Sequence, residues 1–146
     1  MEGFELSIVI NRPIEEAFAV LANLENDAKW RREWIEAINM SEGSLGVGAT
    51  FRLVSEFLGR RIETVYEVTR YELNRIAAWK TVSGPLPLTF QRTFERLEGG
   101  TQVSIRYEAE IRGFLKLIKP LVVNVGKQSL QGDFPKLKEL METRAL

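Results

Sequence analysis

Residues 101–112 read TQVSIRYEAEIR, and this stretch decides the fold. Val103, Ile105 and Tyr107 alternate with polar side chains, as expected of a strand that is buried on one face. Four similar stretches precede it, separated by short turns that contain glycine or asparagine. We therefore predict an antiparallel meander of five strands, at residues 46–57, 60–71, 75–83, 87–97 and 101–112.

The segment before this block predicts one more strand and two short helices. Apolar and polar residues alternate over residues 4–10, and Asn11-Arg12-Pro13 is typical of a helix start. A second helix is expected to begin at Asn26-Asp27 and to carry on one face Trp30, Trp34, Ala37 and Ile38. The sheet would then have six strands, or seven if a bulge divides one of them.

The segment 114–146 is helical in pattern but irregular. Leu130, Phe134 and Leu137 form an apolar stripe, Pro120 suits a helix start, and Pro135 predicts a kink or a new helix. A sheet this wide with so few helices must curl around something. We therefore expect a single α+β domain, residues 1–146, in which a curved antiparallel sheet wraps around a long C-terminal helix and leaves space between them.

The charge balance favours neither nucleic acid nor an anionic membrane. The chain has 20 basic and 20 acidic residues. Its weak basic clusters, at Lys29, Arg31 and Arg32 and at Arg60 and Arg61, are interpreted as solvated charged faces. No nucleic-acid partner is predicted.

The chain contains no cysteine and no histidine. Disulfides, thiolate nucleophiles, the Ser-His-Asp triad and nearly all zinc sites are thereby excluded, and no metal or cofactor is predicted. The N-terminus lacks the cationic start and apolar run of a signal peptide, and residues 117–125 are too short an apolar stretch to span a bilayer. A cytoplasmic protein without integral membrane association is expected.

Arg92 is a charged residue on the predicted apolar face of its strand. A period of two places it on the face of Phe90 and Phe94. A guanidinium is seldom buried unpaired, which leaves three interpretations: an internal structural partner, a position at the rim, or contact with an anionic group of a ligand.

Arg92 and the large aromatic side chains are the candidates for the wall of an internal cavity. The candidate ligand-binding residues are Trp30, Trp34, Phe51, Tyr66, Trp79, Phe90, Arg92, Tyr107 and Phe134. The alternative is that the aromatic residues are ordinary core. An empty, dry pocket of about 300 Å³ would cost on the order of 7 kcal/mol, so a cavity here should be small, wet or occupied.

The order of these elements resembles the helix-grip fold of the START-like, or SRPBCC, superfamily, and in detail its polyketide cyclase/dehydrase-like branch. The matching motifs are residues 10–18, Trp30, and residues 46–51, 67–72, 100–103 and 137–142. The resemblance implies a deep apolar cavity under the C-terminal helix for lipids, sterols, polyketides or quinones. Gly126, Gly132 and Pro135 depart from the regular helix usual in this family and leave the cavity size open. The resemblance assigns no catalytic residue.

Three functions follow as hypotheses. The first is non-enzymatic binding or transport of a small hydrophobic or amphipathic ligand, such as a lipid, polyketide or quinone-like molecule, whose polar end meets Arg92 or a tyrosine hydroxyl. The second is a cyclase or dehydratase that works without metal or histidine. The third is a protein-interaction module, with a homodimer among its forms, if the apolar residues of segment 121–125 face outward.

Overall fold

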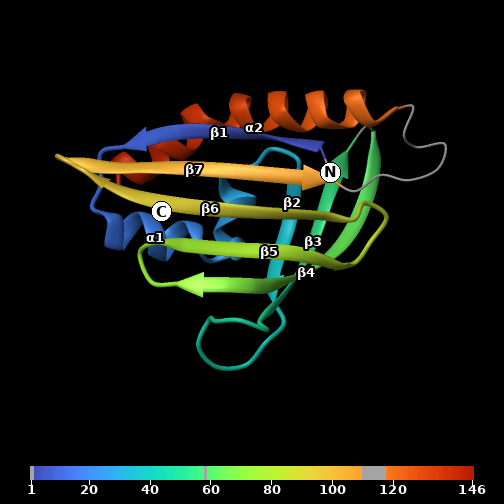
Figure 1. Cartoon of the computed structure of the whole chain (residues 1–146), viewed down its shortest axis with the longest axis horizontal. Helices are drawn as coiled ribbons and strands as arrows, with labels where there is room; N and C mark the ends of the chain where they lie inside the picture. The colour runs from blue at the N-terminus through green and yellow to red at the C-terminus, as the bar shows by residue number, and fades with distance from the viewer. Residues whose placement is uncertain (1, 58, 110–117) are drawn as a thin grey trace.

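Seven antiparallel strands form one curved sheet in the order β1-β7-β6-β5-β4-β3-β2 (Figure 1). The computed structural model describes residues 2–57, 59–109 and 118–146. Its elements are β1 (Glu2–Ile10), α1 (Ile14–Leu21), η1 (Leu24–Lys29), β2 (Trp34–Asn39), β3 (Thr50–Phe57), β4 (Arg60–Glu72), β5 (Ile76–Ser83), β6 (Leu88–Leu97), β7 (Gly100–Ala109) and α2 (Lys119–Glu142).

The predicted meander is confirmed, because β3, β4, β5 and β6 each pair with the next strand in the chain. β1 joins the far side of β7, with Ile8 opposite Val103. The first meander strand begins at Thr50 rather than at residue 46. Residues 110–112, predicted to end the last strand, lie outside the described residues.

The two short helices after β1 are present, but the prediction that the second continues to Ile38 is wrong. It is the six-residue 3₁₀ helix η1, and Trp34–Asn39 form strand β2 instead. Trp34 pairs with Ser55 of β3, and a bulge follows it. The spacing of Trp34, Ala37 and Ile38 fits a helical period, but pairing with β3 makes this segment a strand, in which Ile38 is exposed. β2, rather than a broken strand, supplies the seventh member of the sheet.

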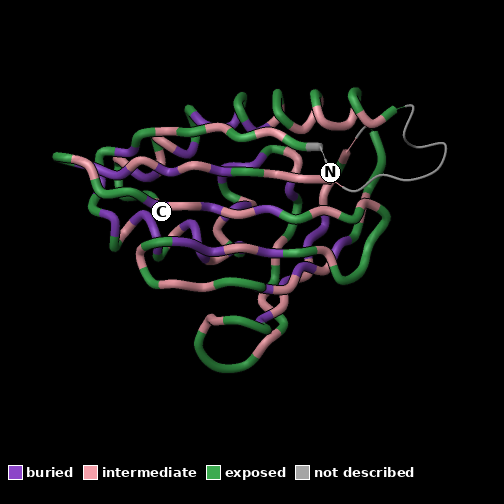
Figure 2. Tube along the Cα trace, in the orientation of Figure 1, coloured by how far each residue is buried: buried purple, intermediate pink, exposed green. Residues whose placement is uncertain are grey.

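α2 is one helix that begins with Pro120 in its first turn, as predicted, and continues through Pro135. Pro135 and Gln131 are both exposed, so water can hydrate the carbonyl that the proline leaves without a donor. The buried residues of α2 begin at Leu130, and none of residues 118–129 is buried (Figure 2). The first half of α2 is therefore much less tightly packed than the second.

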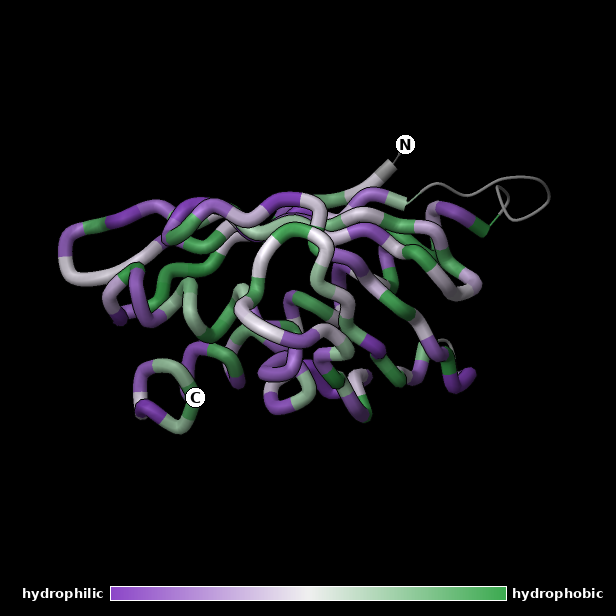
Figure 3. Tube along the Cα trace, turned by 90° about the horizontal axis from the view of Figure 1, so that it is seen from below, coloured by the Kyte–Doolittle hydropathy of each residue, from purple (hydrophilic) through white to green (hydrophobic). Residues whose placement is uncertain are grey.

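The core lies between the concave face of the sheet and the helices, which form a second layer below it (Figure 3). α2 packs against β1. Four aromatic rings stack in a row across neighbouring strands, with centroid separations of 4.9 Å for Trp79–Phe90, 4.9 Å for Phe90–Tyr107 and 5.4 Å for Phe4–Tyr107. This aromatic row runs from the edge strand β1 to the central strand β5.

No helix within the described residues is long and apolar enough to cross a membrane.

Candidate functional site

A half-open pocket of about 120 Å³ lies where the sheet meets the loosely packed half of α2, and we call it the sheet–helix pocket. Its walls are mainly apolar and come from all strands except β5, from the connections before β2 and before β6, and from α2. The lining residues are Gly3, Phe4, Arg31, Glu33, Trp34, Leu53, Ser55, Phe57, Ile62, Thr64, Tyr66, Leu86, Leu88, Tyr107, Glu108, Ala109, Val122, Val123 and Gly126.

The sequence-predicted cavity residues divide into two groups. Trp34, Tyr66 and Tyr107 line the pocket. The others are buried in the core and do not belong to the lining: Trp30, Phe51, Trp79, Phe90, Arg92 and Phe134. Trp79 and Phe90 are buried in the core, whereas Tyr107 and Phe4, at the other end of the aromatic row, line the pocket.

The pocket is small for a ligand site. An empty, dry cavity of its volume would cost about 3 kcal/mol at roughly 24 cal/mol per Å³, which a domain can tolerate. A cavity of about 150 Å³ admits a benzene ring, whereas drug-sized ligands occupy about 300–1,000 Å³. The volume therefore suits one ring or a short chain, and a longer molecule would extend through the open side.

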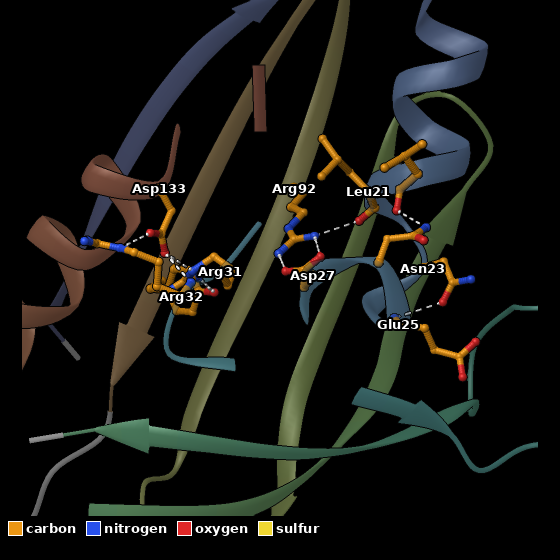
Figure 4. A network of polar contacts seen from close by, with 11 residues as sticks. Leu21, Asn23, Glu25, Asp27, Arg31, Arg32, Arg92 and Asp133 are labelled. Carbon is orange, nitrogen blue, oxygen red and sulfur yellow. Dashed lines mark hydrogen bonds and ion pairs between the residues drawn. The ribbon is translucent and has the colours of Figure 1, made fainter. Parts of the chain in front are cut away.

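Arg92 has an internal structural partner, so of the three interpretations offered by the sequence the first is correct, and neither a rim position nor a ligand contact is needed. Its guanidinium donates to both carboxylate oxygens of Asp27, with 2.9 Å between Nη1 and Oδ1, and to the Leu21 carbonyl at 2.9 Å (Figure 4). Burial lowers the pKa of Arg92, but the carboxylate of Asp27 more than compensates and raises it above its ordinary value. Arg92 thus ties the sheet to η1.

Arg31 is the basic residue that lines the pocket, and its interpretation as part of a solvated face is wrong. Its side chain is buried, with Nε 3.2 Å from Asp133 Oδ2 and Nη1 3.1 Å from the Tyr107 hydroxyl. The guanidinium carbon lies 5.6 Å from the ring centres of both Trp30 and Trp34. Burial lowers the pKa of Arg31, but its interactions with Tyr107, Asp27 and Asp133 raise that pKa above its usual value, so Arg31 stays cationic.

Asp133 holds the helix to this site. Its carboxylate is 1% exposed and accepts a hydrogen bond from Arg32 Nε at 2.8 Å as well as from Arg31 (Figure 4). Arg32 is 75% exposed, so one buried carboxylate serves an inner and an outer guanidinium. Asp133 thereby connects α2 to the segment between η1 and β2.

Tyr66 and Tyr107 supply the phenols of the lining. Burial raises the pKa of the Tyr66 hydroxyl still further above physiological pH, where a phenol is already neutral and can donate a hydrogen bond. Within the described residues no group of three or more acidic side chains is arranged to hold a metal ion. Apolar walls with a few polar groups, here one guanidinium, two phenols and the carboxylates of Glu33 and Glu108, are suited to bind a molecule that has an apolar body and a polar end.

Arg31 and Asp133 are the residues that the sequence analysis missed. A signal was present: Asp133 lies on the stripe of Leu130, Phe134 and Leu137, where an acidic residue needs a buried cation. The stripe does not reveal which cation, because Arg31 lies 102 positions away.

A family model described as polyketide cyclase / dehydrase and lipid transport matches residues 1–142. A search of curated protein sequences gives no significant match.

Solved structures with low sequence identity share the fold. A protein of Thermus thermophilus has a TM-score of 0.82 at 16% identity, covering 97% of this chain and 98% of the other. A START superfamily protein from Mycobacterium smegmatis reaches 0.81 at 14% identity, covering 96% and 97%. The Zhui aromatase/cyclase from Streptomyces sp. R1128 reaches 0.73 at 13% identity, covering 97% and 92%. The helix-grip fold expected from the sequence is confirmed.

Proposed function

Because the chain belongs to the polyketide cyclase / dehydrase and lipid transport family, we propose that it binds and carries a small apolar or amphipathic molecule in the sheet–helix pocket. The observation that carries this proposal is the pocket itself, which is mainly apolar and half-open. A site of this kind removes an apolar ligand from water at roughly 25 cal/mol per Å² of buried surface.

The packing of α2 supports exchange of such a ligand. Val122 and Val123 form part of the pocket wall, yet no residue between 118 and 129 is buried. The second half of the helix is fixed by Leu130, Leu137 and the Asp133 ion pairs. Small displacements of the first half would widen the pocket without disturbing the core.

The test is binding of N-phenylnaphthylamine, a neutral apolar dye whose fluorescence rises on transfer from water. One of its rings matches the volume of the pocket, and the other rings would extend through the open side. We expect saturable binding by the purified protein and loss of binding in Val123→Trp, in which an indole fills the pocket. Native mass spectrometry of protein isolated from cells identifies what the pocket retains.

Val125→Trp is the matched control, because Val125 is half-buried on the same helix but is not part of the lining. It should bind the dye as the unmodified protein does. If the unmodified protein binds no dye, or if both variants bind it unchanged, the sheet–helix pocket is not a ligand site.

A further inference from the structure

We propose that the sheet–helix pocket prefers molecules with an anionic head group, a carboxylate in particular, and that Arg31 is the residue that binds it. This inference rests on the proposed function and names the class of ligand.

Arg31 has donors to spare at the pocket. A guanidinium carries five N–H groups, and contacts within the described residues use Nε for Asp133 and Nη1 for Tyr107. The buried side-chain atoms sealed without a partner are Trp30 Nε1, Trp79 Nε1 and Arg92 Nε, and no nitrogen of Arg31 is among them. Since Arg31 lines the pocket, its remaining N–H groups are available to a ligand there.

The charges around Arg31 leave it incompletely compensated. Asp27 is committed to Arg92 through both of its oxygens. Asp133 divides its charge between Arg31 and Arg32. Two buried carboxylates face two buried guanidiniums here, but Arg31 shares its carboxylate with the exposed Arg32. An anion in the pocket would therefore add to the compensation of Arg31, through charge-assisted hydrogen bonds.

Arg31 is also held in position for this role. Asp133 accepts a hydrogen bond from one nitrogen of the guanidinium, and the Tyr107 hydroxyl accepts one from another. The rings of Trp30 and Trp34 lie next to the guanidinium, each with its centre 5.6 Å from the guanidinium carbon. A preorganised fork loses little side-chain entropy when it binds a carboxylate. Arg92, by contrast, has no exposed surface and is not part of the lining, so it cannot serve a ligand in this way.

Two carboxylates of the lining oppose an anionic ligand, and they limit the preference. Glu108 is paired with Arg106 at 2.9 Å, which reduces its effect. Glu33 is half-buried on the segment that carries Arg31. Repulsion by Glu33 predicts that Glu33→Gln binds a carboxylate more tightly, by a factor of a few.

The experiment compares octanoate with octanol, which have equal chain length and differ in the head group, by calorimetry at about pH 7. We expect octanoate to bind on the order of tenfold more tightly, the usual effect of one added hydrogen bond to a charged group. In Arg31→Gln this ratio should fall to about one, because octanoate loses a charged partner whereas octanol, which carries no charge, loses much less.

Arg32→Gln is the matched control, because it removes the other partner of Asp133 but not a residue of the lining. It should keep the preference for octanoate. If Arg31→Gln does not fold, Arg31→Lys serves in its place, since lysine keeps the charge but lacks the fork and should reduce the ratio.

Equal affinities in the unmodified protein, or a ratio that survives replacement of Arg31, would overturn the inference and leave the proposed function standing. If neither molecule binds and N-phenylnaphthylamine also fails, the proposed function falls and the inference falls with it.

Discussion

Arg92 and Asp27 form an ion pair in which both side chains are fully buried, although they lie 65 positions apart in the sequence. Arg92 is on β6 and Asp27 is on η1. The pair therefore joins the sheet to the 3₁₀ helix that comes directly before the pocket residue Arg31 in the sequence. A buried pair of this kind costs desolvation, but the loss of one partner leaves the other charged and unpaired.

Asp27→Asn should therefore lower the free energy of unfolding by about 3–5 kcal/mol, measured by urea denaturation. Arg96→Gln is the control, because its ion pair with Glu15 is exposed and its loss should change stability little. Replacement of both buried partners, in Asp27→Leu/Arg92→Met, should recover part of the loss. Equal stability of Asp27→Asn and the unmodified protein would show that the buried pair does not hold η1 to the sheet.

The buried hydroxyl of Tyr66 should make the free energy of unfolding depend on pH in the alkaline range. Burial raises the pKa of its hydroxyl in the folded protein, an effect that Tyr107 and Asp27 reinforce and Arg31 opposes. The unfolded chain, with a tyrosine pKa of about 10, releases this proton first, so stability falls as the pH rises above about 10. Tyr66→Phe should flatten that fall in denaturation experiments. A slope as steep as that of the unmodified protein would contradict the assignment.

Most of the fold could be predicted because it follows from local pattern. Strict alternation and short turns specify β3 to β7, and short connections leave antiparallel neighbours as the simple solution. β2 could not be predicted, because the spacing of Trp34, Ala37 and Ile38 also fits a helix. Its state depends on pairing with β3, which is a tertiary contact.

The site was harder to predict than the fold because its polar contacts join distant parts of the chain. Tyr66 and Tyr107 are predictable as inward-facing aromatic residues of a curved sheet. The role of Arg31 depends on Asp133 and Tyr107, which lie 102 and 76 positions away in the sequence. Local composition around Arg31 shows three basic residues in four positions, which is typical of a solvated surface, and burial reverses that interpretation for one of them.

The hydrogen-bonded carboxylate of Glu142 should make the free energy of unfolding depend on pH in the acidic range. Its carboxylate accepts a hydrogen bond from Lys138 and another from the Asn11 backbone N–H at 3.0 Å, and these lower its pKa in that order. The unfolded carboxyl binds a proton more readily, so this contribution is present above a pH of about 4.3 and is lost as the pH falls further. Glu142→Gln should reduce the loss of stability on acidification.

Glu139→Gln is the control for this measurement, because Glu139 is exposed on the same turn of α2 and its side chain makes no hydrogen bond or ion pair within the described residues. It should leave the acid side of the stability curve unchanged. Identical curves for the two variants would contradict a role for Glu142 in tying the end of α2 to the segment after β1.

Gly126 lies in α2 and also in the pocket lining, so Gly126→Ala should change stability and ligand binding in opposite directions. A methyl group there would meet the Phe4 ring at 3.5 Å, which is ordinary contact. Alanine in a helix interior is favoured over glycine by about 0.5–1 kcal/mol, so the free energy of unfolding should rise by that amount. The same methyl narrows the pocket and should weaken binding of N-phenylnaphthylamine.

Gly132→Ala separates these two effects, because Gly132 is exposed on the same helix and does not line the pocket. Its methyl would lie 3.0 Å from Arg32 Nη2, the far end of a side chain that is 75% exposed and can shift. We expect a similar gain in helix stability with unchanged dye binding. If the two variants bind the dye equally well, Gly126 does not limit the volume of the sheet–helix pocket. That volume would then depend on the loose packing of the first half of α2.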